Sequence, residues 1–297
     1  MGAHREAAGL LALVETTPGP WPAIADAVEA AGGTAPLVAA RSETAESAER
    51  WWSVLDRLFA DDPELAVVTV LDDGYPANLA QVYNRPPFLF LRGRLEPHDE
   101  RSVAIVGTRQ PSDDGRRTAR DLAAALAEAG VTVVSGLARG LDTDAHTAAL
   151  AAGGRTIAVL GSGIRRIYPP ENTDLALRIG RSGAVVSQFW PDAPPSRTSF
   201  PRRNVVTSGI ALGTVVVEAA ATSGARMQAR LAREHGRPVF LVESLVHSEP
   251  WASALVDEGG ATVVGGAGDL LPALDRLVAD PGPIPEERGS SRQIRFL

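Results

Sequence analysis

Three glycine-containing segments follow apolar runs in this sequence, and each has the chemistry of a phosphate site. They begin at Val103, Val131 and Thr156. A glycine turn that leads from a strand into a helix leaves backbone N–H groups free to bind an anion at the helix start. The residues that directly follow the three apolar runs are therefore predicted to bind phosphate: Gly107, Thr108, Arg109, Ser135, Gly136, Arg139, Gly140, Gly161, Ser162 and Gly163.

The motif FPRRN and a later Ser-Gly pair extend the predicted anion site. Arg202 and Arg203 are expected in the first turn of a helix, where a positive charge opposes the helix dipole. A bound phosphate explains the two arginines better than packing does, although the alternative that they are a solvated pair of charges stays open. The site is completed by the residues that open the two helices: Asn204, Ser223 and Gly224.

Other polar residues leave catalytic interpretations open, but structural roles are favoured. Asp142 is placed to cap a helix and His146 to be a buried, hydrogen-bonded histidine, rather than ligands of a metal. Glu218 is expected to brace the glycine turns rather than act as a catalytic carboxylate. The first glycine turn does not read GxGxxG, and the chain has no lysine for a GxxxxGK[ST] loop. We predict no catalytic residue, no metal and no cofactor.

The elements that must hold these residues alternate along the chain. From residue 101, apolar runs alternate with helical segments of about 10–15 residues, which predicts an α/β fold with a mostly parallel sheet. The runs are not amphipathic, so helices are expected on both faces of the sheet. Strands are predicted near residues 103–106, 131–134, 156–160, 184–187, 214–218, 238–242 and 261–264.

The remaining segments predict the domain organisation. Residues 1–65 form an N-terminal helical module with helices at Arg5–Val14, Trp21–Ala31 and Ala45–Phe59. Residues 66–100 are a connector in which Phe88–Leu91 is a candidate strand. Residues 101–280 form the main domain, and residues 281–297 are expected to be a flexible tail.

Composition sets further limits. The net charge is −7, yet residues 101–240 hold 18 arginines against 11 acidic residues, while the rest holds 11 against 25. Positive charge is thus concentrated in the segment with the glycine turns. There is no cysteine, so thiolate metal sites are excluded. No apolar run suggests a membrane span or a signal peptide, and a cytoplasmic protein is expected.

At these residues the chain resembles the DNA-processing protein A family, called DprA or Smf. The resemblance runs from about Asp72 to Val242. It is carried by an ordered set of motifs: Tyr75–Pro76, VAIVGTR at Val103–Arg109, VVSGLARGLDTDAH at Val133–His146, TIAVLGSG at Thr156–Gly163, YPPEN at Tyr168–Asn172, FPRRN at Phe200–Asn204 and VVEAAATSGA at Val216–Ala225.

The resemblance implies an extended Rossmann-like fold that binds single-stranded DNA without a catalytic reaction. It also implies protection of incoming strands during natural transformation, loading of a RecA-type recombinase, and a homodimer that pairs through the region after about residue 205. The apolar set Val239–Val242, Leu245, Val246 and Trp251 exceeds what one edge strand requires, which favours pairing, although the alternative that these residues complete the core of the monomer stays open. Two alternatives stay open: a sensor of nucleotide-derived signals, and an enzyme like the nucleoside monophosphate phosphoribohydrolases.

Overall fold

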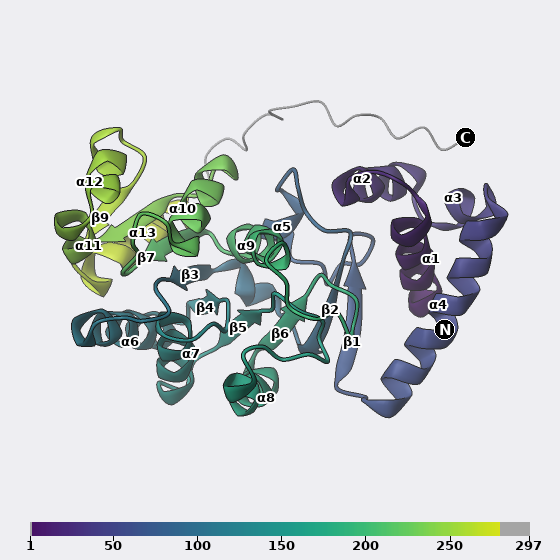
Figure 1. Ribbon diagram of the computed structural model, residues 1–297, viewed down its shortest axis with the longest axis horizontal. Coiled ribbons are helices and arrows are strands. Elements are labelled where there is room, and N and C mark those ends of the chain that lie inside the picture. The colour runs from purple at the N-terminus through teal and green to yellow at the C-terminus, as the bar shows by residue number, and fades with distance from the viewer. Residues whose placement is uncertain (1, 280–297) are drawn as a thin grey trace.

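A mixed sheet of nine strands organises the computed structural model, which describes residues 2–279 (Figure 1). The strand order is β1-β2-β6-β5-β4-β3-β7-β8-β9. From β6 to β9 neighbouring strands are parallel, while β2 pairs antiparallel with both β6 and β1. The strands are β1 (Leu65–Thr69), β2 (Phe88–Gly93), β3 (Ser102–Val106), β4 (Thr132–Ser135), β5 (Thr156–Val159), β6 (Ala184–Ser187), β7 (Gly213–Val216), β8 (Val239–Val242) and β9 (Thr262–Val264).

The predicted α/β class is confirmed, because side chains of the strands alternate between two covered faces. Val103 and Ile105 pack on one face, and Ala104 packs on the other. Helices α6 (Asp113–Glu128), α7 (Leu141–Ala151), α8 (Thr173–Ser182) and α13 (Ala267–Ala279) cover the first face. The second face is covered by α5 (Ala77–Ala80), α9 (Ser199–Ile210), α10 (Gly224–Glu234), α11 (Glu243–Ser248) and α12 (Pro250–Asp257). In Figure 1, α6 to α8 lie below the strands and α9 and α10 above them.

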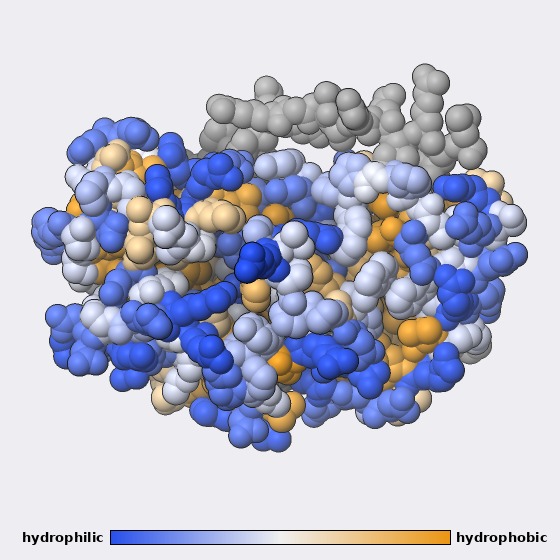
Figure 2. All heavy atoms as spheres, in the orientation of Figure 1, coloured by the Kyte–Doolittle hydropathy of each residue, from blue (hydrophilic) through white to orange (hydrophobic). Residues whose placement is uncertain are grey.

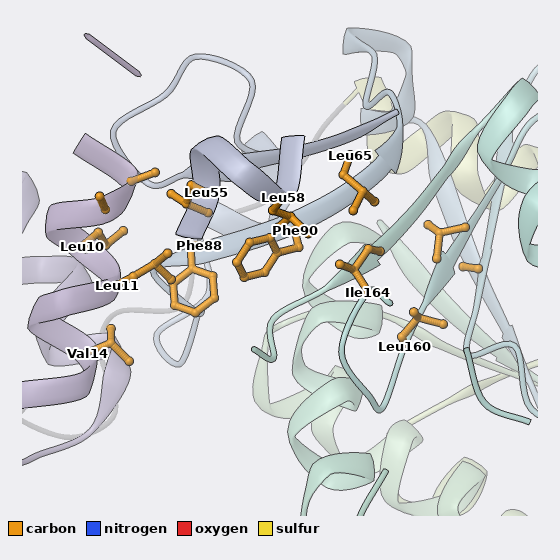
Figure 3. Packing of buried hydrophobic residues seen from close by; sticks show 14 of the residues in the cluster. Leu10, Leu11, Val14, Leu55, Leu58, Leu65, Phe88, Phe90, Leu160 and Ile164 are labelled. Carbon is orange, nitrogen blue, oxygen red and sulfur yellow. The ribbon is translucent and has the colours of Figure 1, made fainter. Parts of the chain in front are cut away.

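The N-terminal module consists of α1 (Gly2–Thr16), α2 (Trp21–Ala31), α3 (Ala35–Ala39) and α4 (Ser42–Asp61). Its three longer helices confirm the predicted ones, and α3 was not predicted. Figure 3 shows leucines of α1 and α4 beside Phe88 and Phe90 of β2, with Leu160 and Ile164 further along. One apolar cluster thus joins the module to the sheet.

The segment predicted as a connector is part of the sheet. Residues 66–100 supply most of β1 and all of β2, together with α5 and the short 3-10 helix Pro97–Glu100. The candidate strand at Phe88–Leu91 is confirmed as β2, which pairs with β6. The division into domains stays a prediction, and the predicted tail, residues 281–297, lies outside the described residues.

The chain reverses its direction of travel across the sheet at β3. From β3 it proceeds to β4, β5 and β6 on one side, and then returns to place β7, β8 and β9 on the other side. The carboxyl ends of β3 and β7 therefore border a topological switch point, where open α/β sheets bind their ligands. In Figure 2, a strongly hydrophilic group lies at the middle of the visible face, where α9 lies in Figure 1, and further hydrophilic groups lie to its lower left, over α6 and α7.

Across residues 2–279, none of the helices combines the length and the apolar character that crossing a lipid bilayer requires.

Candidate nucleic-acid interface

A cavity of about 490 Å³ opens at the switch point between β3 and β7. Its walls come from the turns after β3 and β4, from the start of α9 and the segment before it, and from the start of α10. Eight of the predicted phosphate-binding residues line this cavity: Gly107, Thr108, Arg109, Gly136, Arg203, Asn204, Ser223 and Gly224.

The turn after β3 presents Arg109 to solvent at the rim of the cavity. The Thr108 N–H donates to the backbone oxygen of Glu218 over 2.7 Å, which ties this turn to the end of β7. Gly107 packs so closely against Leu141 that an added Cβ would overlap its side chain. The Arg109 guanidinium lies 5.3 Å from the centre of the Phe200 ring. The turn thus holds an exposed cation beside an aromatic face.

The turn after β4 carries its own anion. Carboxylate oxygen Oδ2 of Asp142 accepts hydrogen bonds of 3.2 Å from the N–H groups of Gly136 and Ala138. The buried Ser135 hydroxyl donates to the Ile105 oxygen, and Gly140 adopts a positive φ of 78° against the backbone of Thr108 and Arg109. These amides were predicted to meet a phosphate, but Asp142 already occupies two of them. Arginine side chains must then supply the positive charge at this turn.

Arg203 is the arginine that reaches into the cavity from α9. Only 8 % of its surface is exposed, and Nη1 donates to the backbone oxygens of Gly136 at 2.5 Å and Val159 at 2.9 Å. Burial lowers the pKa of Arg203, although the nearby Asp142 carboxylate opposes that shift. Burial in turn raises the pKa of Asp142. Arg203 therefore holds two glycine turns together while its charge faces the same cavity.

Arg139 lies beside the cavity rather than in it. With Tyr168 and Phe200 it lines a small adjoining cleft, and its guanidinium forms an exposed ion pair with Glu171. The hydrogen bond from Arg139 lowers the pKa of Glu171. Tyr168 is 38 % exposed, and the centre of its ring lies 6.1 Å from that of Phe200. Two aromatic rings between arginines suit the stacking of unpaired bases.

The structure does not bring the turn after β5 to the cavity. Gly161, Ser162 and Gly163 are all buried, because the segment of residues 190–199 covers them. The Gly163 N–H donates to the Ala193 oxygen over 2.9 Å, and the Ser199 hydroxyl donates to the Gly161 oxygen over 2.5 Å. The glycines here permit close packing of one backbone on another.

Arg202 also lies away from the cavity. Its guanidinium is 4.1 Å from the centre of the Trp21 ring in the N-terminal module. Adjacent residues of one helical turn point in different directions, so Arg202 and Arg203 contact different parts of the fold. Their predicted joint role in phosphate binding stays a prediction.

Several residues at the cavity were not predicted as part of the site, among them Arg197, Phe200 and Gln228. Arg197 and Phe200 approach it from the proline-rich segment and the first turn of α9. Gln228 lies on α10 and is 2 % exposed, and neither its side-chain nitrogen nor its oxygen has a hydrogen-bond partner among the described residues. For Arg197, the signal in the sequence was its position just before the FPRRN motif. Nothing in the sequence pattern distinguishes Gln228 from an ordinary helix residue.

The residues with possible acid, base or metal chemistry have structural partners. His146 is fully buried with Nδ1 at 2.7 Å from the Thr156 hydroxyl, as predicted, and burial lowers its pKa to about 3. The carboxylate of Glu218 accepts a hydrogen bond of 3.0 Å from the Ser112 N–H, which confirms the predicted brace. Within residues 2–279, no group of three or more His, Cys, Asp or Glu side chains is placed to hold a metal ion.

Comparison with known proteins decides the family. The family model for DNA recombination-mediator protein A matches residues 66–275, which span every strand from β2 to β9. This chain belongs to the DNA recombination-mediator protein A family. The family resemblance inferred from the motifs is thereby confirmed, and the matched range contains the whole cavity.

Relatives from several bacteria are similar along most of this chain. Protein Smf of Synechocystis is 38 % identical over 232 residues, which cover 76 % of this chain and 58 % of that protein. DNA processing protein DprA of Streptococcus pneumoniae is 35 % identical over 221 residues, covering 73 % of this chain and 78 % of the relative. The chain thus spans little more than half the length of the Synechocystis relative.

Two solved structures of recombination-mediator relatives share the fold. The X-ray structure of S. pneumoniae DprA superposes with a TM-score of 0.67 at 31 % identity, covering 91 % of this chain and 92 % of that one. DprA from Helicobacter pylori superposes with a TM-score of 0.64 at 25 % identity, covering 72 % of this chain and 96 % of the other. The H. pylori structure is described as giving insight into a single-stranded DNA binding mode of that protein. The extended Rossmann-like fold is therefore confirmed.

Proposed function

We propose that this chain binds single-stranded DNA through the cavity at the switch point. The observation that carries the proposal is the convergence of Arg109, Arg197 and Arg203 on one cavity. The open start of α10 at Ser223 and Gly224 faces the same space. These residues lie in the positively charged part of an otherwise acidic chain. The chain also belongs to a family in which the H. pylori relative has a described single-stranded DNA binding mode.

Each group has a distinct part in the proposed interface. Arg109 and Arg197 are exposed, so their guanidinium groups are free to follow the phosphates of a strand. Arg203 holds the glycine turns and adds charge at the cavity wall. Phe200 and Tyr168 supply aromatic faces. Unpaired bases can stack on these faces, whereas the bases of a duplex are already stacked on one another.

The wider role is part of the same proposal. The chain would protect incoming single strands during DNA uptake and assist a RecA-type recombinase in loading onto them. It would do so in the cytoplasm, as a binding protein without a catalytic reaction, and as a homodimer. Support for this role comes from membership of the family.

The test of binding is a salt titration. Fluorescence anisotropy of a labelled oligonucleotide should give an affinity that falls steeply with salt, because each phosphate contact adds a slope of about −0.7 to log K against log salt for single strands. Three arginine contacts predict a slope of about −2. An affinity that does not change with salt would refute phosphate binding at this cavity.

Because of the volume of the cavity, a small nucleotide is the second candidate ligand. About 490 Å³ lies within the usual range of roughly 300–1,000 Å³ for small-molecule sites. Affinity for DNA should rise with oligonucleotide length, whereas a sensor would be saturated by a mononucleotide. Release of free base from a nucleoside monophosphate would instead identify the hydrolase alternative.

The apolar residues from Val239 to Trp251, which favoured a homodimer in the sequence, do not support it in the structure. β8 is an interior strand, and Val239–Val242 and Leu245 are buried inside the chain. The edge strand on this side of the sheet is β9, where Val263 is 38 % exposed. Light scattering at high micromolar concentration tests pairing directly, and a strictly monomeric mass would refute it.

A further inference from the structure

The N-terminal module contacts α9, the helix that carries the cavity residue Arg203. The Arg202 guanidinium lies 4.1 Å from the centre of the Trp21 ring and 5.5 Å from that of Phe189. Burial in this position lowers the pKa of Arg202. The next residue along α9 is Arg203, whose side chain lines the cavity. One turn of helix thus has one arginine on the module and the next in the binding site.

A second connection runs through Trp190. Its ring stacks on Trp51 of α4 at 4.8 Å and on Phe88 of β2 at 5.6 Å between ring centres. Trp190 begins the segment that ends at α9, and this segment contributes Arg197 to the cavity. The same segment accepts a hydrogen bond of 2.9 Å from the Arg165 N–H at Pro191, so it is held at its start.

Helix α2 is attached to the rest of the fold through Trp21, through its buried apolar face and through two ion pairs. Trp21, its first residue, lies under Arg202, and its later residues Asp26 and Glu29 form ion pairs with Arg85. The apolar cluster of Figure 3 fixes α1 and α4 against β2 and the segment after β5. The module is therefore a firm support, and Trp21 is where that support meets α9.

We propose that Trp21 and Arg202 are positioning residues for single-stranded DNA binding. They hold the first turn of α9, so that Arg197 and Arg203 keep their places in the cavity, and neither of them contacts the strand. The family match begins at residue 66 and leaves the module without an assigned role. This inference rests on the proposed function, but it also predicts a property that does not depend on DNA.

The DNA test compares Trp21→Leu, Arg202→Gln and the double variant. Each single change should weaken binding about five-fold, the order of one cation–π contact. The double variant should be no weaker than Trp21→Leu alone, because that change already breaks the Arg202–Trp21 contact. The salt slope should equal that of the unchanged protein, since no phosphate contact is removed. Arg202→Lys keeps a cation over the ring and should recover most of the affinity.

The chain offers a matched control within the module. Arg5 lies 4.8 Å from the centre of the Trp52 ring, which is the same type of contact without any link to α9. Trp52→Leu and Arg5→Gln should therefore leave DNA affinity within about two-fold of the unchanged protein. An equal loss in these controls would show that any weakening of the module has the same effect, and would refute a specific role of Trp21.

The DNA-independent test is limited trypsin digestion followed by mass spectrometry. Trp21→Leu should speed cleavage after the exposed Arg197 several-fold relative to cleavage after the exposed Arg139, which serves as the reference within each molecule. An unchanged ratio would overturn the positioning role, whether or not the protein binds DNA. A salt slope that is shallower by about 0.7 in Arg202→Gln, with normal affinity in Trp21→Leu, would show instead that Arg202 binds phosphate.

Discussion

The turns after β3 and β5 have similar sequences and opposite surroundings. VGTR after β3 opens onto the cavity and ends in the exposed Arg109, whereas LGSG after β5 is covered by residues 190–199. Gly107 in the first turn lets the Leu141 side chain of α7 come close, and Gly163 in the other lets a backbone segment come close. A glycine turn can therefore serve as a binding site only where no other part of the chain occupies it.

The largest expected effect is on DNA affinity, when an arginine near each of the two turns is changed to glutamate. Arg109→Glu should weaken single-stranded DNA binding at least ten-fold, about 1.5–3 kcal/mol for a lost charged hydrogen bond. Arg166→Glu, an equally exposed change in the segment after the covered turn, should alter affinity less than two-fold. Anisotropy measures both, and melting temperatures should stay unchanged. Equal losses would mean that charge anywhere on this surface matters more than the open turn.

The next effect is on the stability of the protein, when a glycine of the covered turn after β5 is changed. In Gly163→Ala an added Cβ would overlap the backbone oxygens of Trp190 and Pro191, so the free energy of unfolding should fall by about 1–3 kcal/mol. Gly224→Ala, at the open start of α10, has nothing within 4 Å of the added atom and should leave stability nearly unchanged. Urea unfolding gives both values. A stable Gly163→Ala would show that the covering segment is loosely held.

A smaller effect concerns the buried side of the turn after β4. His146 has a pKa of about 3 in the folded protein against 6.5 in the unfolded chain, so the unfolded chain binds more protons between these values. Stability should therefore fall as pH drops below about 6.5, by about 2 kcal/mol from this residue at pH 5. His146→Gln should remove that part of the pH dependence in urea titrations. An unchanged pH profile would indicate that the histidine can take up its proton in the folded state.

The smallest effect lies at the cavity wall. Gln228→Leu removes a buried amide that has no partner among the described residues, and should raise the free energy of unfolding by about 1 kcal/mol. Gln188→Leu is the matched control, because that buried amide donates to the Arg202 oxygen over 2.6 Å and its loss should lower stability. A fall in both variants would contradict an unpaired amide at Gln228.

The sequence predicted the main sheet well, because its strands are short apolar runs between helices of ordinary length. All seven strands predicted from residue 101 onward were found, while the short helices α3, α5 and α11 were too brief to show a helical period. The site was harder to predict. Gly161–Gly163 met every local criterion, yet only tertiary packing reveals the segment that covers them. Likewise, adjacent arginines in FPRRN gave no sign that Arg202 would meet Trp21 in a distant helix.

The pairing of β3 with β7 has a consequence for how the protein is made. Val103 pairs with Gly213, although β4, β5 and β6 are synthesised between them. Closing so long a loop costs chain entropy and is expected late in folding. A nascent chain that stops before β7 can build β4, β5 and β6 beside β3, but it lacks one wall of the cavity. Truncated or stalled chains would therefore have most of the sheet and no complete binding site.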